Sequence, residues 1–145
     1  MEFVDKYLMP HKMAVVFTVI TTFIVFASGL AMKHYEPQWI YIAVNFISGC
    51  SLLSYYAYIG WDSKNRLGYT WKDSFISAAL IGIISDGILK LTIFFLFAAS
   101  ISDLLVMIVV TLVDAVFTGL LAIIGYAAAK YFGSNPIKAK KQTKH

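Results

Sequence analysis

The sequence predicts an all-α integral membrane protein, a bundle of four transmembrane helices arranged as two helical hairpins. Hydrophobic residues make up 59% of the 145 residues, and charged residues make up only 14%. The mean hydropathy of +0.73 is far above the value expected for a soluble domain of this size. The apolar residues also gather into four runs, each reaching the roughly 20 residues that a helix needs to cross about 30 Å of hydrocarbon.

The four apolar runs define the expected membrane-spanning domain, residues 14–129. In chain order they cover residues 14–32, 38–60, 75–99 and 104–129. We expect helices because a barrel would need alternating segments of about ten residues, and the sequence contains none. All the prolines lie outside the runs, where a helix must begin or end: Pro10, Pro37 and Pro136.

Two short connections join the runs into hairpins. The segment KHYEPQ, residues 33–38, connects the first two runs, and SISD, residues 100–103, connects the last two. In the second connection we expect Ser102 or Asp103 to cap the fourth helix, because either side chain can accept a hydrogen bond from a free amide of the first turn.

Positive charges predict the orientation of the chain. The N-terminal arm, residues 1–13, holds two lysines; segment 61–74 holds three basic residues; and the tail, residues 130–145, holds five lysines. The opposite side holds Lys33 alone. Cytoplasmic segments of membrane proteins carry such an excess of lysine and arginine, so we expect both termini in the cytoplasm of a multi-pass protein of the cell membrane. Three tryptophans near predicted helix ends agree with these limits: Trp39, Trp61 and Trp71.

Three charged residues interrupt the apolar runs. Asp86 and Lys90 are four residues apart and therefore share one face of the third helix. Counted from the outer ends of the last two helices, Lys90, Asp86 and Asp114 lie about 12, 18 and 15 Å deep at about 1.5 Å per residue. We therefore expect Lys90 to lie between two carboxylates in one layer near the middle of the membrane.

A charge near the bilayer centre costs about 2.5–3.5 kcal/mol, so we expect the charge cluster to face the interior of the bundle. Polar residues at helical spacings predict a buried seam around it: Asn45, Ser48, Thr111 and Thr118. Three nearby tyrosines are instead expected near the inner membrane interface: Tyr55, Tyr56 and Tyr58.

Enzymatic chemistry finds little support in the sequence. The histidines are confined to chain ends and a loop: His11, His34 and His145. No glycine-rich phosphate-binding motif is present, and the longest polar segment, 61–74, is too short for a catalytic domain. We expect no cofactor and no metal, and we attribute the basic residues to orientation and not to nucleic-acid binding. The expected partners are the lipid bilayer and other membrane subunits or a second copy of the chain.

Two interpretations of Asp86, Lys90 and Asp114 remain open. In one, a permanent ion-pair network fixes helix packing in a non-catalytic subunit or assembly factor of a larger membrane complex. In the other, Asp86 and Asp114 bind and release a proton or cation in a homo-oligomeric transporter, channel or holin-like pore. The first is slightly favoured because no transport motif is complete. A third class, a viral or immunity-type membrane factor, is suggested only by small size. A wet cleft reaching either aspartate would favour permeation.

Overall fold

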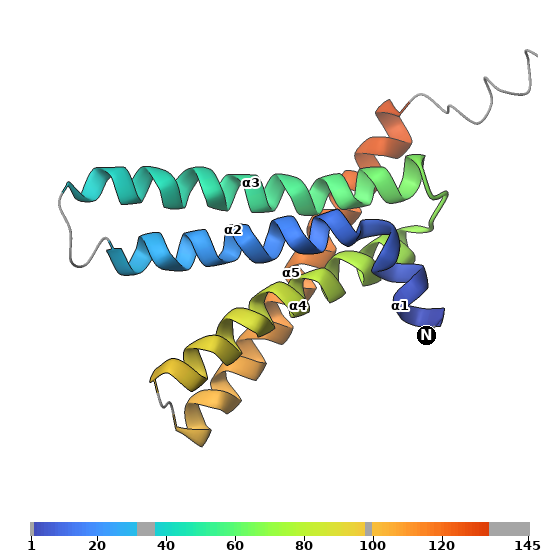
Figure 1. Ribbon diagram of the computed structural model, residues 1–145. Coiled ribbons are helices and arrows are strands. Elements are labelled where there is room, and N and C mark those ends of the chain that lie inside the picture. Colours follow the sequence, from blue (N-terminus) through green and yellow to red (C-terminus); the bar gives the residue numbers. More distant parts are fainter. Residues whose placement is uncertain (1, 32–36, 98–99, 134–145) are drawn as a thin grey trace, which may run out of the picture.

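The computed structural model describes residues 2–31, 37–97 and 100–133, which are helical apart from short turns and caps. In chain order the elements are α1 (Glu2–Tyr7), the 3-10 helix η1 (Met9–His11), α2 (Lys12–Ala31), α3 (Gln38–Asn65), α4 (Trp71–Phe97) and α5 (Ile101–Phe132) (Figure 1). Within these ranges, four helices are long and apolar enough to cross a membrane, the first of them continuous with α1 and η1. The all-helical class with four candidate spans is therefore confirmed, and it suggests a membrane protein.

The helices extend beyond the apolar runs. α3 continues past residue 60 to Asn65, α4 begins at Trp71 and not at 75, and α5 runs from Ile101 to Phe132. A helix of 28 residues such as α3 is about 42 Å long, which exceeds the hydrocarbon thickness of about 30 Å. The apolar runs therefore mark the segment of each helix that is long enough to cross the hydrocarbon. The helices continue into the polar residues that flank these runs. Most of the first predicted connection lies outside the described residues.

Side-chain caps begin the last two helices. At α5 the hydroxyl of Ser100 accepts from the Asp103 amide at 3.3 Å, and the Asp103 carboxylate accepts from the Ser100 amide at 2.8 Å. We predicted Ser102 or Asp103 as the N-cap residue, but the N-cap is Ser100, and Asp103 is the N3 residue of its capping box. At α4, Thr70 and Asp73 form the same reciprocal pair of bonds.

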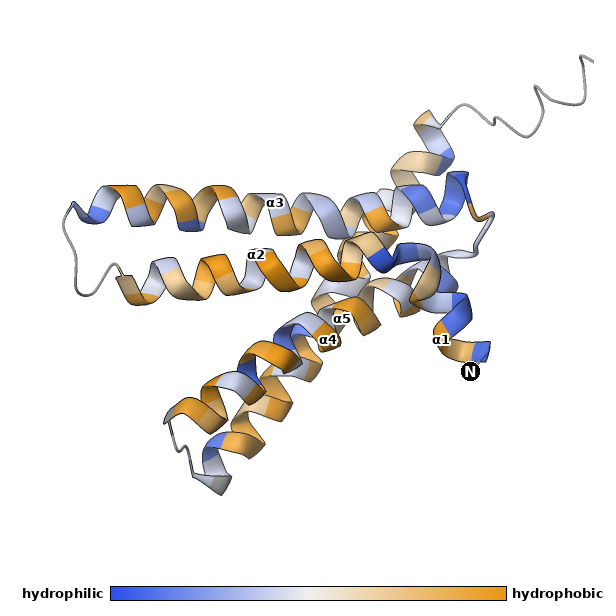
Figure 2. Cartoon of the chain, viewed as in Figure 1, coloured by the Kyte–Doolittle hydropathy of each residue, from blue (hydrophilic) through white to orange (hydrophobic). Residues whose placement is uncertain are grey.

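Figure 1 shows two hairpins, α2 with α3 and α4 with α5, which meet at one end and diverge toward the other. The shared end also carries α1, η1 and the connection between α3 and α4. Figure 2 shows hydrophilic residues gathered there and hydrophobic residues along the outer halves of the hairpins. We name this the charged end; its basic residues include Lys6, Lys12, Lys64, Arg66 and Lys72. The two hairpins therefore pack together at the charged end and separate toward the other end.

Glycines bring the backbones of α3 and α5 into contact. A Cβ atom placed on Gly60 would lie 1.8 Å from the carbonyl oxygen of Ala122, and one on Gly125 would lie 1.7 Å from that of Ala57. Neither site has room for a side chain, so the two helices cross with backbone against backbone. Small residues serve this purpose in membrane helices, where close approach replaces the hydrophobic driving force.

The N-terminal segment folds against the charged end. Lys6 Nζ lies 2.8 Å from a carboxylate oxygen of Asp73, and the Tyr7 hydroxyl donates to the same oxygen at 3.0 Å. Arg66 donates to the carbonyl of Pro10 at 2.9 Å. The arm is therefore joined by hydrogen bonds to α4 and to the connection that precedes it.

Candidate functional site

The structure brings the three charged residues of the apolar runs together between α4 and α5. Lys90 Nζ lies 2.5 Å from Asp86 Oδ2 and 3.5 Å from Asp114 Oδ2. The hydroxyl of Thr111 donates to Asp86 at 2.8 Å and lies 3.2 Å from Lys90 Nζ. Asp86 and Lys90 share a face by their four-residue spacing, and Thr111 and Asp114 share a face by their three-residue spacing. The ammonium thus lies between two carboxylates, with its shorter contact on Asp86.

The predicted polar seam is divided between the two hairpins. Thr111 belongs to the charge cluster, and the hydroxyl of Thr118 lies 3.3 Å from the carbonyl of Ala78 on α4. Asn45 lies elsewhere, with its amide nitrogen 3.9 Å from the Cβ position of Gly29 on α2. Ser48 is half-buried on α3. The α5 members therefore lie at the contact with α4, whereas Asn45 lies at the contact between α2 and α3.

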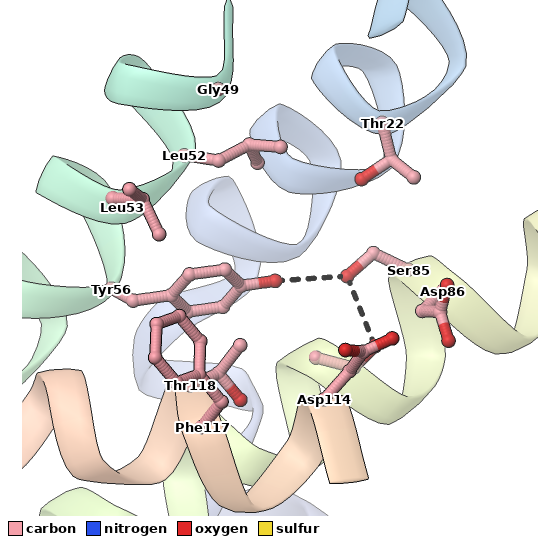
Figure 3. A pocket seen from close by; sticks show the side chains of 11 residues that line it. Thr22, Gly49, Leu52, Leu53, Tyr56, Ser85, Asp86, Asp114, Phe117 and Thr118 are labelled. Carbon is pink, nitrogen blue, oxygen red and sulfur yellow. Dashed lines mark hydrogen bonds between the residues drawn. The ribbon is translucent and has the colours of Figure 1, made fainter. Parts of the chain in front are cut away.

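A pocket of about 320 Å³ lies where the hairpins begin to separate (Figure 3). All four long helices line it, α2 through Thr22 alone. Its lining residues are Thr22, Gly49, Leu52, Leu53, Tyr56, Gly82, Ser85, Asp86, Asp114, Phe117 and Thr118. We name it the interhairpin pocket. Both carboxylates of the charge cluster reach its wall, whereas Lys90 borders a separate groove formed by α4 and α5 alone.

The two carboxylates differ in exposure. The side chain of Asp114 is 49% exposed, against 21% for Asp86 and 17% for Lys90. Asp86 holds the shorter contact with the ammonium and also accepts from Thr111. Asp114 has the longer contact with Lys90, so its carboxylate is the one more available to a ligand. With both carboxylates and the ammonium charged, the cluster of Asp86, Lys90 and Asp114 carries one net negative charge.

The pocket lies deep along the helices. Residue 86 is 15 positions after the first residue of α4 and 11 before its last, or about 22 and 16 Å at about 1.5 Å per residue. Residue 114 is 13 positions after the start of α5 and 18 before its end. Both carboxylates therefore lie near the middle of these helices, far from either end. In a membrane, this middle region would offer them the least water.

Tyr56 and Ser85 are pocket residues that the sequence did not indicate. The side chain of Tyr56, which we expected to approach the inner membrane interface, is buried, and its hydroxyl lies 3.4 Å from that of Ser85. Tyr56 and Phe117 both line the pocket together with Asp114 (Figure 3). The signal in the sequence was helical spacing, since Tyr56 follows Gly49 by seven residues and lies on the same face of α3.

The pocket combines negative charge with polar and aromatic groups. Two carboxylates, hydroxyl groups and aromatic rings can hold a positively charged ligand. Across residues 2–31, 37–97 and 100–133, no group of three or more His, Cys, Asp or Glu side chains could hold a metal ion.

Comparison with protein-family models, with curated proteins and with solved structures finds no match to the chain.

Proposed function

We propose that the protein is a multi-pass membrane protein, with both termini cytoplasmic, that binds a cation in the interhairpin pocket and carries it across the bilayer. Asp86 and Asp114 are the binding carboxylates, and the working unit is a homo-oligomer because four helices alone enclose little space. The observation that carries this proposal is the half-exposed carboxylate of Asp114 in a pocket far from the helix ends. The sequence slightly favoured a subunit role, and the pocket reverses that preference.

The free energy of a buried charge supports a cation as the ligand. An ionised side chain near the bilayer centre costs about 2.5–3.5 kcal/mol on insertion scales. Lys90 offsets this cost chiefly at Asp86, which it approaches at 2.5 Å, and less at Asp114, which it approaches at 3.5 Å. A cation in the pocket supplies Asp114 with a counter-charge on the side that Lys90 does not cover.

Buried hydroxyl groups support a polar route from the charged end to the pocket. Ser74, Ser77 and Ser85 follow one face of α4, and each is at most 1% exposed. Ser74 and Ser85 are 11 positions apart, or about 16 Å. Within the described part of the chain, Ser77 Oγ is the one buried side-chain oxygen without a hydrogen-bond partner. Such a group is a natural partner for an internal water.

Flux through reconstituted protein tests the proposal. Proteoliposomes with an imposed gradient should take up a monovalent cation, either H⁺, Na⁺, K⁺ or a labelled organic ammonium, faster than empty vesicles. Asp114→Asn should lower the rate about tenfold or more, as expected when one partner of a desolvated charge pair is removed. Asp5→Asn is the matched control, because Asp5 is an exposed carboxylate on α1, outside the pocket. Equal fluxes in wild type and Asp114→Asn would refute the proposal.

A subunit of a larger membrane complex is the second candidate, favoured by the opening between the hairpins. Large apolar side chains on their outer halves are exposed, including Phe46 and Ile47 on α3 and Phe95 on α4. A partner helix could cover them and offer a basic residue to Asp114. Native mass spectrometry after mild extraction distinguishes the candidates: a fixed stoichiometry with other subunits supports this one, and a homo-oligomer supports transport.

A further inference from the structure

The walls of the interhairpin pocket are more apolar than a site for an inorganic ion requires. Leu52 and Leu53 line it from α3, and the aromatic residues Tyr56 and Phe117 line it together with Asp114 (Figure 3). Two of the oxygen-bearing side chains that could replace the water of a small ion already form hydrogen bonds. Asp86 accepts from Lys90 and Thr111, and the Ser85 hydroxyl donates within its own helix at 2.5 Å to the carbonyl of Ile81.

A divalent inorganic cation would need several oxygen ligands in place of its water. Ca²⁺ takes about six to eight oxygens, and Mg²⁺ keeps much of its water shell. An organic cation has the opposite requirements, because it needs one counter-charge and gains free energy from apolar and aromatic contacts. Attraction between a cation and the face of an aromatic ring strengthens when water is excluded.

We propose that the interhairpin pocket binds a monovalent organic cation, an ammonium or phosphonium that carries apolar or aromatic groups. The charge lies against the carboxylate of Asp114, and the apolar groups lie against Tyr56, Phe117 and Leu53. This inference rests on the proposed cation-carrying function and specifies its substrate class.

Size and access agree with such a ligand. The volume of about 320 Å³ falls within the roughly 300–1,000 Å³ of small-molecule sites. Phe117 is 52% exposed and Leu53 is 45% exposed, so the pocket opens on the apolar flank of the bundle. An amphiphilic cation that partitions into lipid therefore reaches the site sideways, without crossing the charged end.

Binding of tetraphenylphosphonium to the full chain tests the inference. Equilibrium dialysis with the radiolabelled cation, corrected for empty micelles, should show saturable binding to wild type. Asp114→Asn should weaken binding about tenfold or more, and Phe117→Ala should weaken it about three- to tenfold. Asp5→Asn and Phe95→Ala should bind as wild type does, because these exposed residues lie outside the pocket.

Two further samples keep the test decisive. Asp114→Glu retains the charge and should retain binding, so it guards against a folding defect in Asp114→Asn. Tetraphenylborate has nearly the same shape and the opposite charge, and it should bind no more than to empty micelles. If wild type does not bind the phosphonium, the inference is overturned. Equal binding in wild type and Asp114→Asn overturns it too.

Failure of this inference is distinguishable from failure of the proposed function. Flux of Na⁺, K⁺ or H⁺ that depends on Asp114, without phosphonium binding, leaves cation transport standing and removes the organic substrate. Phosphonium binding that depends on Asp114, without any cation flux, supports the site and refutes transport. Absence of both binding and flux refutes both.

Discussion

The crossing of α3 and α5 permits a stability prediction whose magnitude follows from the structure. A Cβ atom at Gly125 would lie 1.7 Å from the carbonyl oxygen and 2.6 Å from the carbonyl carbon of Ala57. Ordinary van der Waals contact begins at about 3.4 Å, so Gly125→Ala must move the helices apart by roughly 1.7 Å. The obstacle is backbone, which cannot rotate away as a flexible side chain can.

Two opposing terms set the size of the effect. Overpacking a close contact costs typically about 1–3 kcal/mol, and a backbone obstacle places Gly125→Ala at the upper end. Replacing glycine by alanine inside a helix gains about 1 kcal/mol from helix propensity. The steric term is the larger, so we expect the free energy of unfolding to fall by about 2 kcal/mol.

A matched substitution separates these terms. A Cβ atom on Gly49 of α3 would meet nothing within 4 Å, so Gly49→Ala retains the propensity gain without the clash. Titration of the purified variants from mild micelles into dodecyl sulfate, followed by circular dichroism, should rank Gly49→Ala at or above wild type and Gly125→Ala well below it. If the two variants unfold at the same detergent fraction, the backbone contact is not what holds α3 against α5.

Three further predictions concern single side chains. Tyr56→Phe removes the 3.4 Å contact with the hydroxyl of Ser85 but keeps the ring, so it should cost less than about 1 kcal/mol and leave phosphonium binding in dialysis unchanged, whereas Tyr56→Ala should weaken that binding. Burial lowers the pKa of the His11 imidazole below its usual 6.5. The unfolded chain therefore binds the proton more readily, and stability should fall as the pH drops below about 6.5. The midpoint of thermal unfolding, measured between pH 5 and 8, should lose this pH dependence in His11→Gln. The hydrogen bond from Lys6 holds the pKa of the Asp73 carboxyl well below its usual range, so the stability that this ion pair contributes is present above about pH 4 and is lost in acid. Asp73→Asn should lower the midpoint of thermal unfolding at pH 7, and adding Lys6→Met to Asp73→Asn should lower it little further.

Local pattern predicted the helices and the spacing within each helix. Apolar runs located four candidate spans, because a helix that crosses hydrocarbon must be apolar over about 20 residues. The pairing of Asp86 with Lys90 follows from one turn of helix, and the approach of Asp114 follows from equal depth on two helices of a hairpin. These inferences need only the rise per residue and the direction of the chain.

Tertiary geometry was beyond the reach of that pattern. The open end of the bundle depends on how two hairpins pack, and a single sequence shows which residues are small without showing what they contact. Gly60 and Gly125 meet the partner backbone, whereas Gly49 and Gly87 meet nothing within 4 Å. The burial of Tyr56 was missed for the same reason, because its neighbour Ser85 lies on another helix.

The glycine crossing also explains why the interhairpin pocket forms where it does. Two helices that cross at an angle separate on either side of their closest point, and the backbones of α3 and α5 are closest at Gly60 and Gly125. Asp114 is 11 positions before Gly125, or about 16 Å along α5, where the growing gap leaves the interhairpin pocket. Gly125→Ala would move α3 and α5 apart at their closest point and so change the shape of that gap. The substitution should therefore weaken both cation binding and stability. Asp114→Asn should weaken binding alone if the carboxylate serves a ligand, and a loss of folded protein in Asp114→Asn would instead identify the ion pair with Lys90 as structural.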